Sequence, residues 1–532
     1  MQHQNSTIMK TNFPILFLAL FLFQISCKEA PKEPLPPPNI IFIMTDDHAN
    51  NAMSAYSTKL IETPNMDRIG KEGIKFTNSF VTNSICAPSR AVLLTGRYSH
   101  LNGLRDNRDH FDGNQMNFPK ILQQTGYQTS VVGKWHLKTA PTGFDYWNVL
   151  IGQGPYYNPK MVENGDTIDH EGYTTDIITD LALNYLEKRD TTKPFCMLYH
   201  HKAPHRNWMP HPKYFDLYKD LELPLPETFY DDYSTRSKAA SDQDQRIEHM
   251  YLSHDMKLLP EDWGGGKDPG TGGSGGSHDA GPGHVASMNR LTPEQRAAWD
   301  AHYDEVRKYF RESNLEGKEL LEWKYQRYIK DYLRCVKSVD DNIGRVLDYL
   351  DENGLTENTL VVYTSDQGFY LGEHGWYDKR FMYEESLRMP LVMRYPALTK
   401  PSQTVEKMVL NLDFAPTFLD LAGAAIPTDF QGQSLKPFLE NETPDDWRSS
   451  FYYQYYEYPH GWHLVKKHYG VRTETHKLIH FYDDIDSWEL FDLQADPNEL
   501  NNVFGQENFA EIQSNLEKEL AQLKKDLKVP EG

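Results

Sequence analysis

The stretch that settles the fold class reads Asn39-Ile-Ile-Phe-Ile-Met-Thr45, and two carboxylates, Asp46 and Asp47, follow it directly. A continuous apolar run of this length, rich in isoleucine, is typical of a strand that is buried on both faces. Such strands belong to parallel sheets that are covered by helices on both sides. Because open α/β sheets place their ligand sites at the carboxyl ends of the strands, we expect Asp46 and Asp47 in a functional site.

Further strand and helix segments alternate along the chain. Residues 360–364 repeat the buried-strand pattern and also lead into a polar group, Ser365-Asp366-Gln367-Gly368. We expect further strands at 129–133, 195–200 and 389–394, and helices at 64–73, 118–124 and 321–353. The alternation predicts an α/β fold with a large, mostly parallel sheet sandwiched by helices.

The composition and residue pattern of the sequence change at two places. Residues 264–283 are dominated by glycine and small polar residues, which predicts a surface insertion. A nucleotide-binding loop is disfavoured there, because no strand precedes the segment and no Gly-Lys-Ser/Thr follows it. Beyond residue 446, aromatic residues alternate with others, and a helical segment closes the chain at 509–527. We therefore expect a main α/β domain over 39–446 and a C-terminal subdomain over 447–532, built from a small antiparallel sheet and one helix.

Composition limits the possible partners. The 532 residues are 39% hydrophobic and 13% aromatic, which describes a globular protein. A formal net charge of −21 argues against nucleic acid as a partner, and a polyanionic ligand would need a local basic pocket. The four cysteines show neither metal-binding spacing nor a dense disulfide pattern. Any special chemistry of a cysteine must therefore come from its local context.

The first 27 residues are typical of an export signal. The apolar run over 13–25 has the length of a secretory signal and is short for a membrane span. It ends at Ser26-Cys27-Lys28, as in a bacterial lipoprotein, so Cys27 is the expected lipidation site and residues 28–38, rich in proline, an extended tether. Gln24 is unusual three positions before that cysteine, which leaves ordinary secretion open. We expect a protein anchored by lipid in the cell envelope, at the periplasm or cell surface, with a soluble periplasmic protein as the alternative.

Asp46, Asp47, Asp366 and Gln367 offer a set of ligands made only of oxygen. Adjacent carboxylates repel each other, and a cation between them keeps both ionised, whereas an Asp-Asp pair alone is also compatible with a solvated turn. Three carboxylates and one amide carbonyl suit a hard cation. We expect one Ca²⁺ ion here, with Mg²⁺ as the second choice.

The most distinctive motif of the chain is Cys86-Ala-Pro-Ser-Arg90, with Thr95-Gly-Arg97 after it. Pro88 fits the first turn of a helix, which places Cys86 at a helix amino end, where an anion is favoured. A lone cysteine is more often a buried hydrophobic residue, but the spacing of proline and arginine argues for a special role. The motif resembles the one that a dedicated enzyme oxidises in type I formylglycine sulfatases of the alkaline phosphatase-like superfamily. Among these, the chain looks most similar to bacterial enzymes that act on polysaccharides.

This resemblance implies that Cys86 is converted to formylglycine by a formylglycine-generating or radical maturation enzyme. The hydrated aldehyde would be a ligand of the metal ion, together with the carboxylates at the strand ends. One of its oxygens would attack sulfur, and the second would expel sulfate and restore the aldehyde. Arg90, one helical turn away, would lie against the hydrate.

Four more catalytic residues match motifs of the same family in the expected chain order. In Gly-Lys-Trp-His, Lys134 would hold a sulfate oxygen and His136 would hydrogen-bond the hydrate. His205, in Ala-Pro-His, matches the histidine that protonates the leaving group. Lys379, in Tyr-Asp-Lys-Arg, matches the lysine that bridges the sulfate. Each match taken singly is also compatible with a surface turn or a solvated cation.

The substrate is expected to be a sulfated glycan. The segment before Lys379 resembles sulfatases that act on carbohydrates, and His374 within it is expected to contact the sugar. A basic, aromatic-rich patch is expected to bind sulfated chains, with a solvated hairpin as the alternative; its members are His463, Lys466, Lys467, His468 and Arg472. We therefore expect hydrolysis of sulfate monoesters on fragments of algal or host polysaccharide.

Two other functions are compatible with the sequence. Related formylglycine enzymes on the same fold hydrolyse phosphonate or phosphate esters, and the charge and leaving groups of those substrates make similar demands. The third hypothesis is an envelope protein that binds glycans without catalysis, in which Cys86 stays a thiol.

Overall fold

The computed structural model describes residues 1–3, 7, 9, 35–270 and 282–530. The chain divides into two units, Met1–Pro36 and Pro37–Gly532. The expected lipidation site Cys27, most of the export signal and tether, and residues 271–281 of the glycine-rich insertion lie outside the described residues. Among the residues that are described, no helix combines the length and the apolar character needed to span a bilayer.

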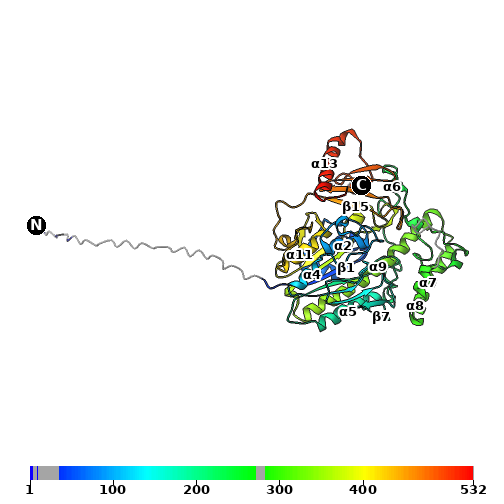
Figure 1. Ribbon diagram of the computed structural model, residues 1–532, viewed down its shortest axis with the longest axis horizontal. Coiled ribbons are helices and arrows are strands. Elements are labelled where there is room, and N and C mark those ends of the chain that lie inside the picture. The colour runs from blue at the N-terminus through cyan, green and yellow to red at the C-terminus, as the bar shows by residue number, and fades with distance from the viewer. Residues whose placement is uncertain (4–6, 8, 10–34, 271–281, 531–532) are drawn as a thin grey trace. The chain divides into compact units, whose positions relative to one another are not determined.

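In the described part of the second unit, ten strands form one sheet (Figure 1). Its order is β13 (Gln403–Val405), β2 (Ile74–Phe76), β12 (Leu391–Arg394), β9 (Thr359–Ser365), β1 (Asn39–Thr45), β8 (Phe195–His200), β4 (Gln128–Gly133), β5 (Tyr146–Leu150), β6 (Lys160–Glu163) and β7 (Asp166–Asp169). The central strands β9, β1, β8, β4 and β5 run parallel to one another. Antiparallel pairings flank them, through β12 on one side and through β6 and β7 on the other. The predicted α/β sheet is confirmed.

β1 shows why this sheet is buried on both faces. Ile40, Phe42 and Met44 belong to one hydrophobic cluster, and Ile41 and Ile43 belong to a second. All five side chains are inaccessible to solvent. Burial of each such side chain stabilises the fold by about 1.5–3 kcal/mol, so both faces of the strand contribute.

Helices cover the two faces. The first cluster includes residues of α2 (Cys86–Thr95), α4 (Phe118–Gln124) and α11 (Phe414–Leu421). The second includes residues of α1 (Pro64–Lys71), α5 (Thr174–Lys188) and α9 (Gly317–Glu352). Other helices of this part of the chain are α3 (Ser99–Asn102), α6 (Lys238–Ser241), α7 (Pro282–Met288), α8 (Pro293–Ser313), α10 (Glu384–Leu387) and α12 (Lys436–Leu439). Two short pairs of strands lie outside the large sheet, β10 (Tyr370–Leu371) with β11 (Tyr377–Asp378) and β3 (Ser79–Phe80) with β14 (Val409–Leu410).

The helix α8 was not predicted from the sequence. A capping box sets its start, because the Thr292 hydroxyl accepts from the Gln295 amide while the Gln295 side chain accepts from the Thr292 amide. Such a box is visible in the sequence as a threonine three residues before a glutamine. It could have located the helix.

The C-terminal part forms its own antiparallel sheet. Its strands are β15 (Ser450–Tyr455), β16 (His468–Thr473), β17 (His476–Phe481) and β18 (Ser487–Asp492). The helix α13 (Ala510–Asp526) buries Leu516 and Leu520 in the first cluster. In Figure 1, α13 and β15 lie at the top of the second unit. The expected sheet with one helix is confirmed, and residue 447 falls between α12 and β15.

Candidate active site

The predicted site residues meet at the carboxyl edge of the parallel strands. Asp46 and Asp47 follow β1, Asp366 and Gln367 follow β9, and Lys134 follows β4. Because β9, β1, β8 and β4 are neighbours in the sheet, residues from distant parts of the chain lie close together there. This is the edge at which open α/β sheets bind their ligands.

Asp46, Asp47 and Asp366 form an acidic cluster. Their carboxylate oxygens lie within 4.8 Å of one another, and all three side chains are buried. The Asp47 amide donates to Asp366 Oδ1 at 3.2 Å, and Gln367 Nε2 donates to Asp47 Oδ1 at 2.5 Å. Gln367 Oε1 and Asp46 Oδ1 are buried without a hydrogen-bond partner, whereas Asp46 Oδ2 contacts the ammonium of Lys134. Buried polar atoms normally have partners, so this set of oxygens fits a divalent cation.

Two ammonium groups contact the same cluster. Lys134 Nζ forms an ion pair with Asp46, and Lys379 Nζ lies 2.5 Å from Asp47 Oδ1. Burial lowers the pKa of Lys134 well below its usual value. Burial also disfavours a charged Lys379, but nearby negative groups, Asp47 foremost, outweigh it and raise its pKa. Burial, reinforced by Asp366, raises the pKa of Asp47 to about 6 despite Lys379, and a cation would favour its ionised form.

Cys86 begins α2, as predicted, and its side chain is buried. Its Sγ lies within 4.8 Å of a carboxylate oxygen of Asp46 and a ring nitrogen of His205. Burial raises the pKa of the Cys86 thiol to about 12. An unmodified Cys86 is therefore protonated near neutral pH and is a poor nucleophile.

Arg90 joins the ends of two strands. Its Nε and Nη2 lie 3.0 Å from Asp366 Oδ2, and its Nη1 donates to the Lys134 carbonyl at 2.8 Å. The Arg90 side chain is 3% exposed. The guanidinium thus fixes one carboxylate of the cluster relative to the backbone that carries Lys134.

Two histidines complete the site as neutral imidazoles. Since His205 Nδ1 lies 2.6 Å from the Arg206 carbonyl, which only accepts, the ring proton is on Nδ1, while Nε2 lies 3.8 Å from Asp47 Oδ2. Burial, with the charge of Lys134 added, lowers the pKa of both His205 and His136 well below the usual value. His136 Nδ1 is buried without a hydrogen-bond partner. Both rings are therefore available to a bound ligand.

Gly133 allows the chain to pass close to the His200 carbonyl where β4 ends. Its φ is +103°, and a Cβ at this position would lie 1.9 Å from the His200 carbonyl oxygen. Only glycine tolerates both conditions. The next amide, that of Lys134, donates to the same carbonyl at 2.9 Å, so the glycine sets where Lys134 leaves the strand.

Comparison with known proteins agrees with this geometry. The family model described as Sulfatase matches residues 38–424, and the model for the C-terminal part of N-sulphoglucosamine sulphohydrolase matches residues 372–526. The chain belongs to the sulfatase family. It is therefore a sulfuric ester hydrolase, as its motifs predicted.

Individual sulfatases are similar over nearly the whole chain. An N-acetylglucosamine-6-O-sulfatase of Bacteroides thetaiotaomicron is 50% identical over 529 residues, 98% of this chain and 92% of the relative. A sulfatase solved in complex with its substrate, D-glucosamine-2-N,6-O-disulfate, is 51% identical, with a TM-score of 0.88 over 92% of this chain and 98% of that one. The human N-acetylglucosamine-6-sulfatase is 27% identical over 79% of this chain and 67% of its own length.

The sulfatase site contains residues that were not predicted to lie beside Lys379. His463 Nε2 lies 2.7 Å from Asp378 Oδ2, and the Arg380 guanidinium bonds Oδ1 of the same carboxylate. These side chains flank Lys379, and all three residues have a positive φ. Asp378 and Arg380 were visible as neighbours of Lys379, but nothing in the sequence connects His463, between β15 and β16, to them.

The structure places three predicted substrate contacts in the protein interior. His374 is fully buried, with Nδ1 2.8 Å from Asp231 Oδ2. His468 is also fully buried, and its Nδ1 bonds the Lys466 carbonyl at 2.8 Å. Arg472 Nη2 donates to Glu384 at 3.2 Å. In the free protein these side chains bond to protein partners, and their contact with a sugar stays a prediction.

The lysines of the basic patch also have acidic partners. Lys466 pairs with Asp484 at 2.6 Å and Lys467 with Asp483 at 2.9 Å. The positive charges of the patch are therefore neutralised by local acidic side chains, a combination that composition alone cannot distinguish from a binding surface.

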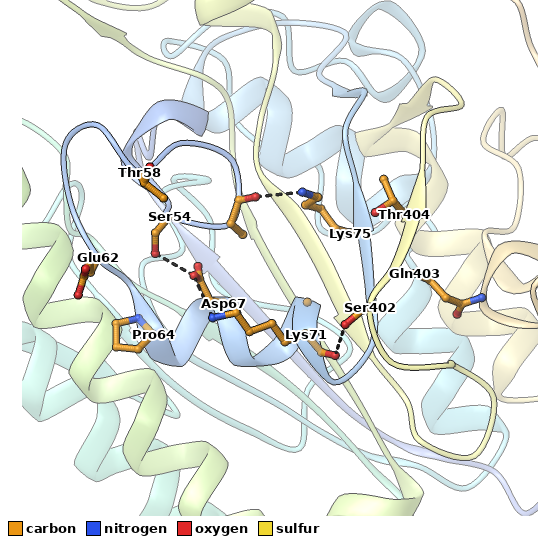
Figure 2. A pocket seen from close by; sticks show the side chains of 12 residues that line it. Ser54, Thr58, Glu62, Pro64, Asp67, Lys71, Lys75, Ser402, Gln403 and Thr404 are labelled. Carbon is orange, nitrogen blue, oxygen red and sulfur yellow. Dashed lines mark hydrogen bonds and ion pairs between the residues drawn. The ribbon is translucent and has the colours of Figure 1, made fainter.

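A separate cavity lies beside α1 and the β2–β13 edge of the sheet (Figure 2). It measures about 600 Å³, and none of the predicted site residues lines it. The Ser54 hydroxyl donates to Asp67 at 2.8 Å, and Lys75 donates to the Ala55 carbonyl at 3.0 Å (Figure 2). The polar groups of this cavity thus bond one another, and the chemistry of the protein is concentrated at the strand ends.

Proposed function

We propose that this sulfatase hydrolyses the 6-O-sulfate ester of glucosamine residues in sulfated glycans. The observation that carries the proposal is the convergence of Cys86, three carboxylates, two lysines and two histidines at one edge of the sheet. Support for the sugar comes from the Bacteroides relative and from the solved relative with its glucosamine disulfate. Both are about half identical to this chain over more than nine-tenths of its length.

Cys86 would act in a modified form. Oxidation of its side chain to formylglycine by a maturation enzyme would supply a hydrated aldehyde, whose hydroxyl is the nucleophile toward sulfur. The position at the amino end of α2 suits an oxygen that carries negative charge, because the positive end of the helix dipole lies there.

Asp46, Asp47, Asp366 and Gln367 would hold one Ca²⁺ ion, together with an oxygen on residue 86. When bound, the cation supplies Lewis-acid polarisation of the sulfate and of the nucleophile. The ligand set contains only oxygen, which suits Ca²⁺ better than a softer metal. Arg90 keeps Asp366 in its place in this set through the contacts at 3.0 Å.

The remaining residues would act on the sulfate and on the departing oxygen. Lys134 and Lys379 would bind sulfate oxygens, because their ammonium groups lie at the carboxylates that surround the nucleophile. His205, whose ring proton is on Nδ1 in the free protein, would first take a proton from solvent on Nε2 when the negatively charged sulfate ester binds. It would then give this proton to the sugar oxygen, while Nδ1 stays bonded to the Arg206 carbonyl. His136 would accept a hydrogen bond from the hydrate.

Export with a lipid anchor at Cys27 is part of the proposal. The apolar run over 13–25 and the Ser-Cys-Lys that follows it support it. At the start of the second unit, Tyr127 donates to the Pro38 carbonyl at 2.7 Å and Asn358 donates to the Pro37 carbonyl at 3.3 Å. The chain thus enters β1 at the amino edge of the sheet, opposite to the edge that carries Asp46.

The test is release of inorganic sulfate by protein that has been produced together with a formylglycine-generating enzyme. We expect release from N-acetylglucosamine-6-sulfate, and none from the Cys86→Ala variant. Turnover of an aryl phosphonate in preference to the sugar sulfate would instead favour the phosphonate hydrolase. Tight binding of sulfated glycans without any release of sulfate would favour the binding protein.

A further inference from the structure

We propose that the loop between β5 and β6, residues 151–156, is a positioning element that orients two groups of the active site at once. Gln153 orients the ammonium of Lys134, and Tyr156 fixes the backbone of His205. The inference rests on the proposed function, because it takes Lys134 as a sulfate ligand and His205 as the proton donor. No feature of the sequence had connected this loop to the site.

Gln153 is the second partner of the Lys134 ammonium. Lys134 Nζ donates to Gln153 Oε1 in addition to its ion pair with Asp46. A lysine side chain is long and flexible, so two acceptors are needed to fix the position of its ammonium group. Gln153 is neutral, and it therefore orients the ammonium without cancelling the charge that a sulfate oxygen needs. A carboxylate at the same place would compete with the substrate.

Tyr156 secures the segment that carries His205. Its hydroxyl donates to the His205 carbonyl at 2.6 Å, and the Lys202 ammonium lies 4.4 Å from the centre of its ring. Burial raises the pKa of the Tyr156 hydroxyl well above its usual value, so it remains a donor. With its carbonyl held by Tyr156 and its Nδ1 bonded to the Arg206 carbonyl, His205 keeps Nε2 directed toward the carboxylate cluster.

The loop is built to hold this shape. Gly152 and Gly154 have φ of +61° and +68°, which glycine adopts without strain. The Gly154 amide donates to the Ile151 carbonyl at 3.1 Å. At its far end, Thr174 of α5 donates through its amide to the Tyr156 carbonyl and through its hydroxyl to the Pro155 carbonyl, both at 2.8 Å. A loop anchored to α5 on one side and to β5 on the other can transmit a fixed position to both catalytic residues.

Single substitutions test the two roles of the loop, at Lys134 and at His205, separately. Gln153→Met keeps the length of the side chain and removes the acceptor, and we expect kcat/KM to fall about 10- to 100-fold on N-acetylglucosamine-6-sulfate and on 4-nitrophenyl sulfate alike. Tyr156→Phe should lower kcat/KM about 10-fold on the sugar sulfate and less than about 3-fold on the nitrophenyl ester, which needs little protonation. The matched controls, Gln123→Met and Tyr146→Phe, lose side-chain bonds to Asp145 and Glu163 away from the site and should keep full activity.

Gln153→Glu tests the neutrality of the acceptor. It preserves an oxygen at the same distance from the backbone but adds a negative charge beside Lys134. We expect a KM raised about 10-fold for both sulfate esters, with kcat changed less, and a melting temperature close to that of the parent protein. An unchanged KM would contradict the orienting role.

Double variants test whether Gln153 acts through Lys134 and Tyr156 through His205, separately from the proposed function. Lys134→Ala and His205→Ala are measured first, and activity losses in these variants establish the roles on which the inference rests. In the Lys134→Ala background, Gln153→Met should add less than about 2-fold, and Tyr156→Phe should add as little in the His205→Ala background. Full additivity in both backgrounds would overturn the positioning role while leaving the proposed function intact. A parent enzyme that releases no sulfate would instead refute the proposed function.

Discussion

Replacing Arg90 with alanine should release the ends of β4 and β9 from each other. The guanidinium makes two contacts of 3.0 Å with Asp366 Oδ2 and one hydrogen bond of 2.8 Å to the Lys134 carbonyl. The Arg90→Ala variant would leave the Asp366 carboxylate, which is fully buried as a side chain, without its cation. The Lys134 carbonyl would keep only the weaker contact from His200 Nδ1 at 3.3 Å.

The expected loss of stability follows from these contacts. Removing one partner of a buried charge pair costs about 3–5 kcal/mol, because the other charge stays in the interior uncompensated. We therefore expect the free energy of unfolding to fall by about 3–5 kcal/mol in the presence of a chelator. Added Ca²⁺ should reduce the loss, since the cation would offset the charge of Asp366.

Urea unfolding at fixed protein concentration measures this loss as a shift in midpoint at unchanged slope. The control is Arg345→Ala, because Arg345 pairs with Asp180 at the surface and is 44% exposed. Exposed pairs contribute less than about 1 kcal/mol. If Arg90→Ala and Arg345→Ala shifted the midpoint equally, the bridging role of Arg90 would be wrong.

Three further predictions follow from the site. Ca²⁺ added to chelated protein at about 100 times its dissociation constant should stabilise the fold by about 2.7 kcal/mol, measured by thermal unfolding. The Asp47→Asn variant should lose most of this stabilisation. An unaltered stabilisation in the variant would exclude Asp47 as a ligand. His205→Ala should lower kcat on the sugar sulfate about 10²- to 10⁴-fold and on 4-nitrophenyl sulfate less than about 10-fold, and a uniform loss across leaving groups would argue against His205 as the acid. Gly133→Ala should destabilise the protein by more than about 3 kcal/mol, because its Cβ would meet the His200 carbonyl; a stability within about 1 kcal/mol of the parent would contradict this.

The sheet could be predicted because its signal is local. Continuous apolar runs mark β1, β8 and β9 as buried strands, and parallel strands bring their carboxyl ends to one edge. The acidic cluster followed from that rule, since Asp46, Asp47 and Asp366 stand directly after two such strands. The antiparallel pairing of β12 with β9 is set by long-range packing and has no local signature in the strand itself.

The sequence is least informative for residues whose roles depend on their partners. His468 and Arg472 belong to a basic, aromatic segment. The composition of such a segment is the same whether its side chains are exposed to solvent or paired with neighbouring acidic residues. In the structure Glu384 neutralises Arg472, and the ring of His468 stacks on Tyr453. Gln153 was overlooked for the opposite reason, because a single glutamine in a glycine-rich turn carries no pattern.

The most direct test of the account compares two quantities in one preparation of protein: the mass of the peptide that contains residue 86, and the sulfate released from N-acetylglucosamine-6-sulfate. Formylglycine makes the peptide about 18 Da lighter than cysteine. We predict that preparations made with different amounts of maturation enzyme release sulfate at rates proportional to the lighter fraction. Release at full rate by protein whose Cys86 is entirely thiol, or no release by fully converted protein, would contradict the account.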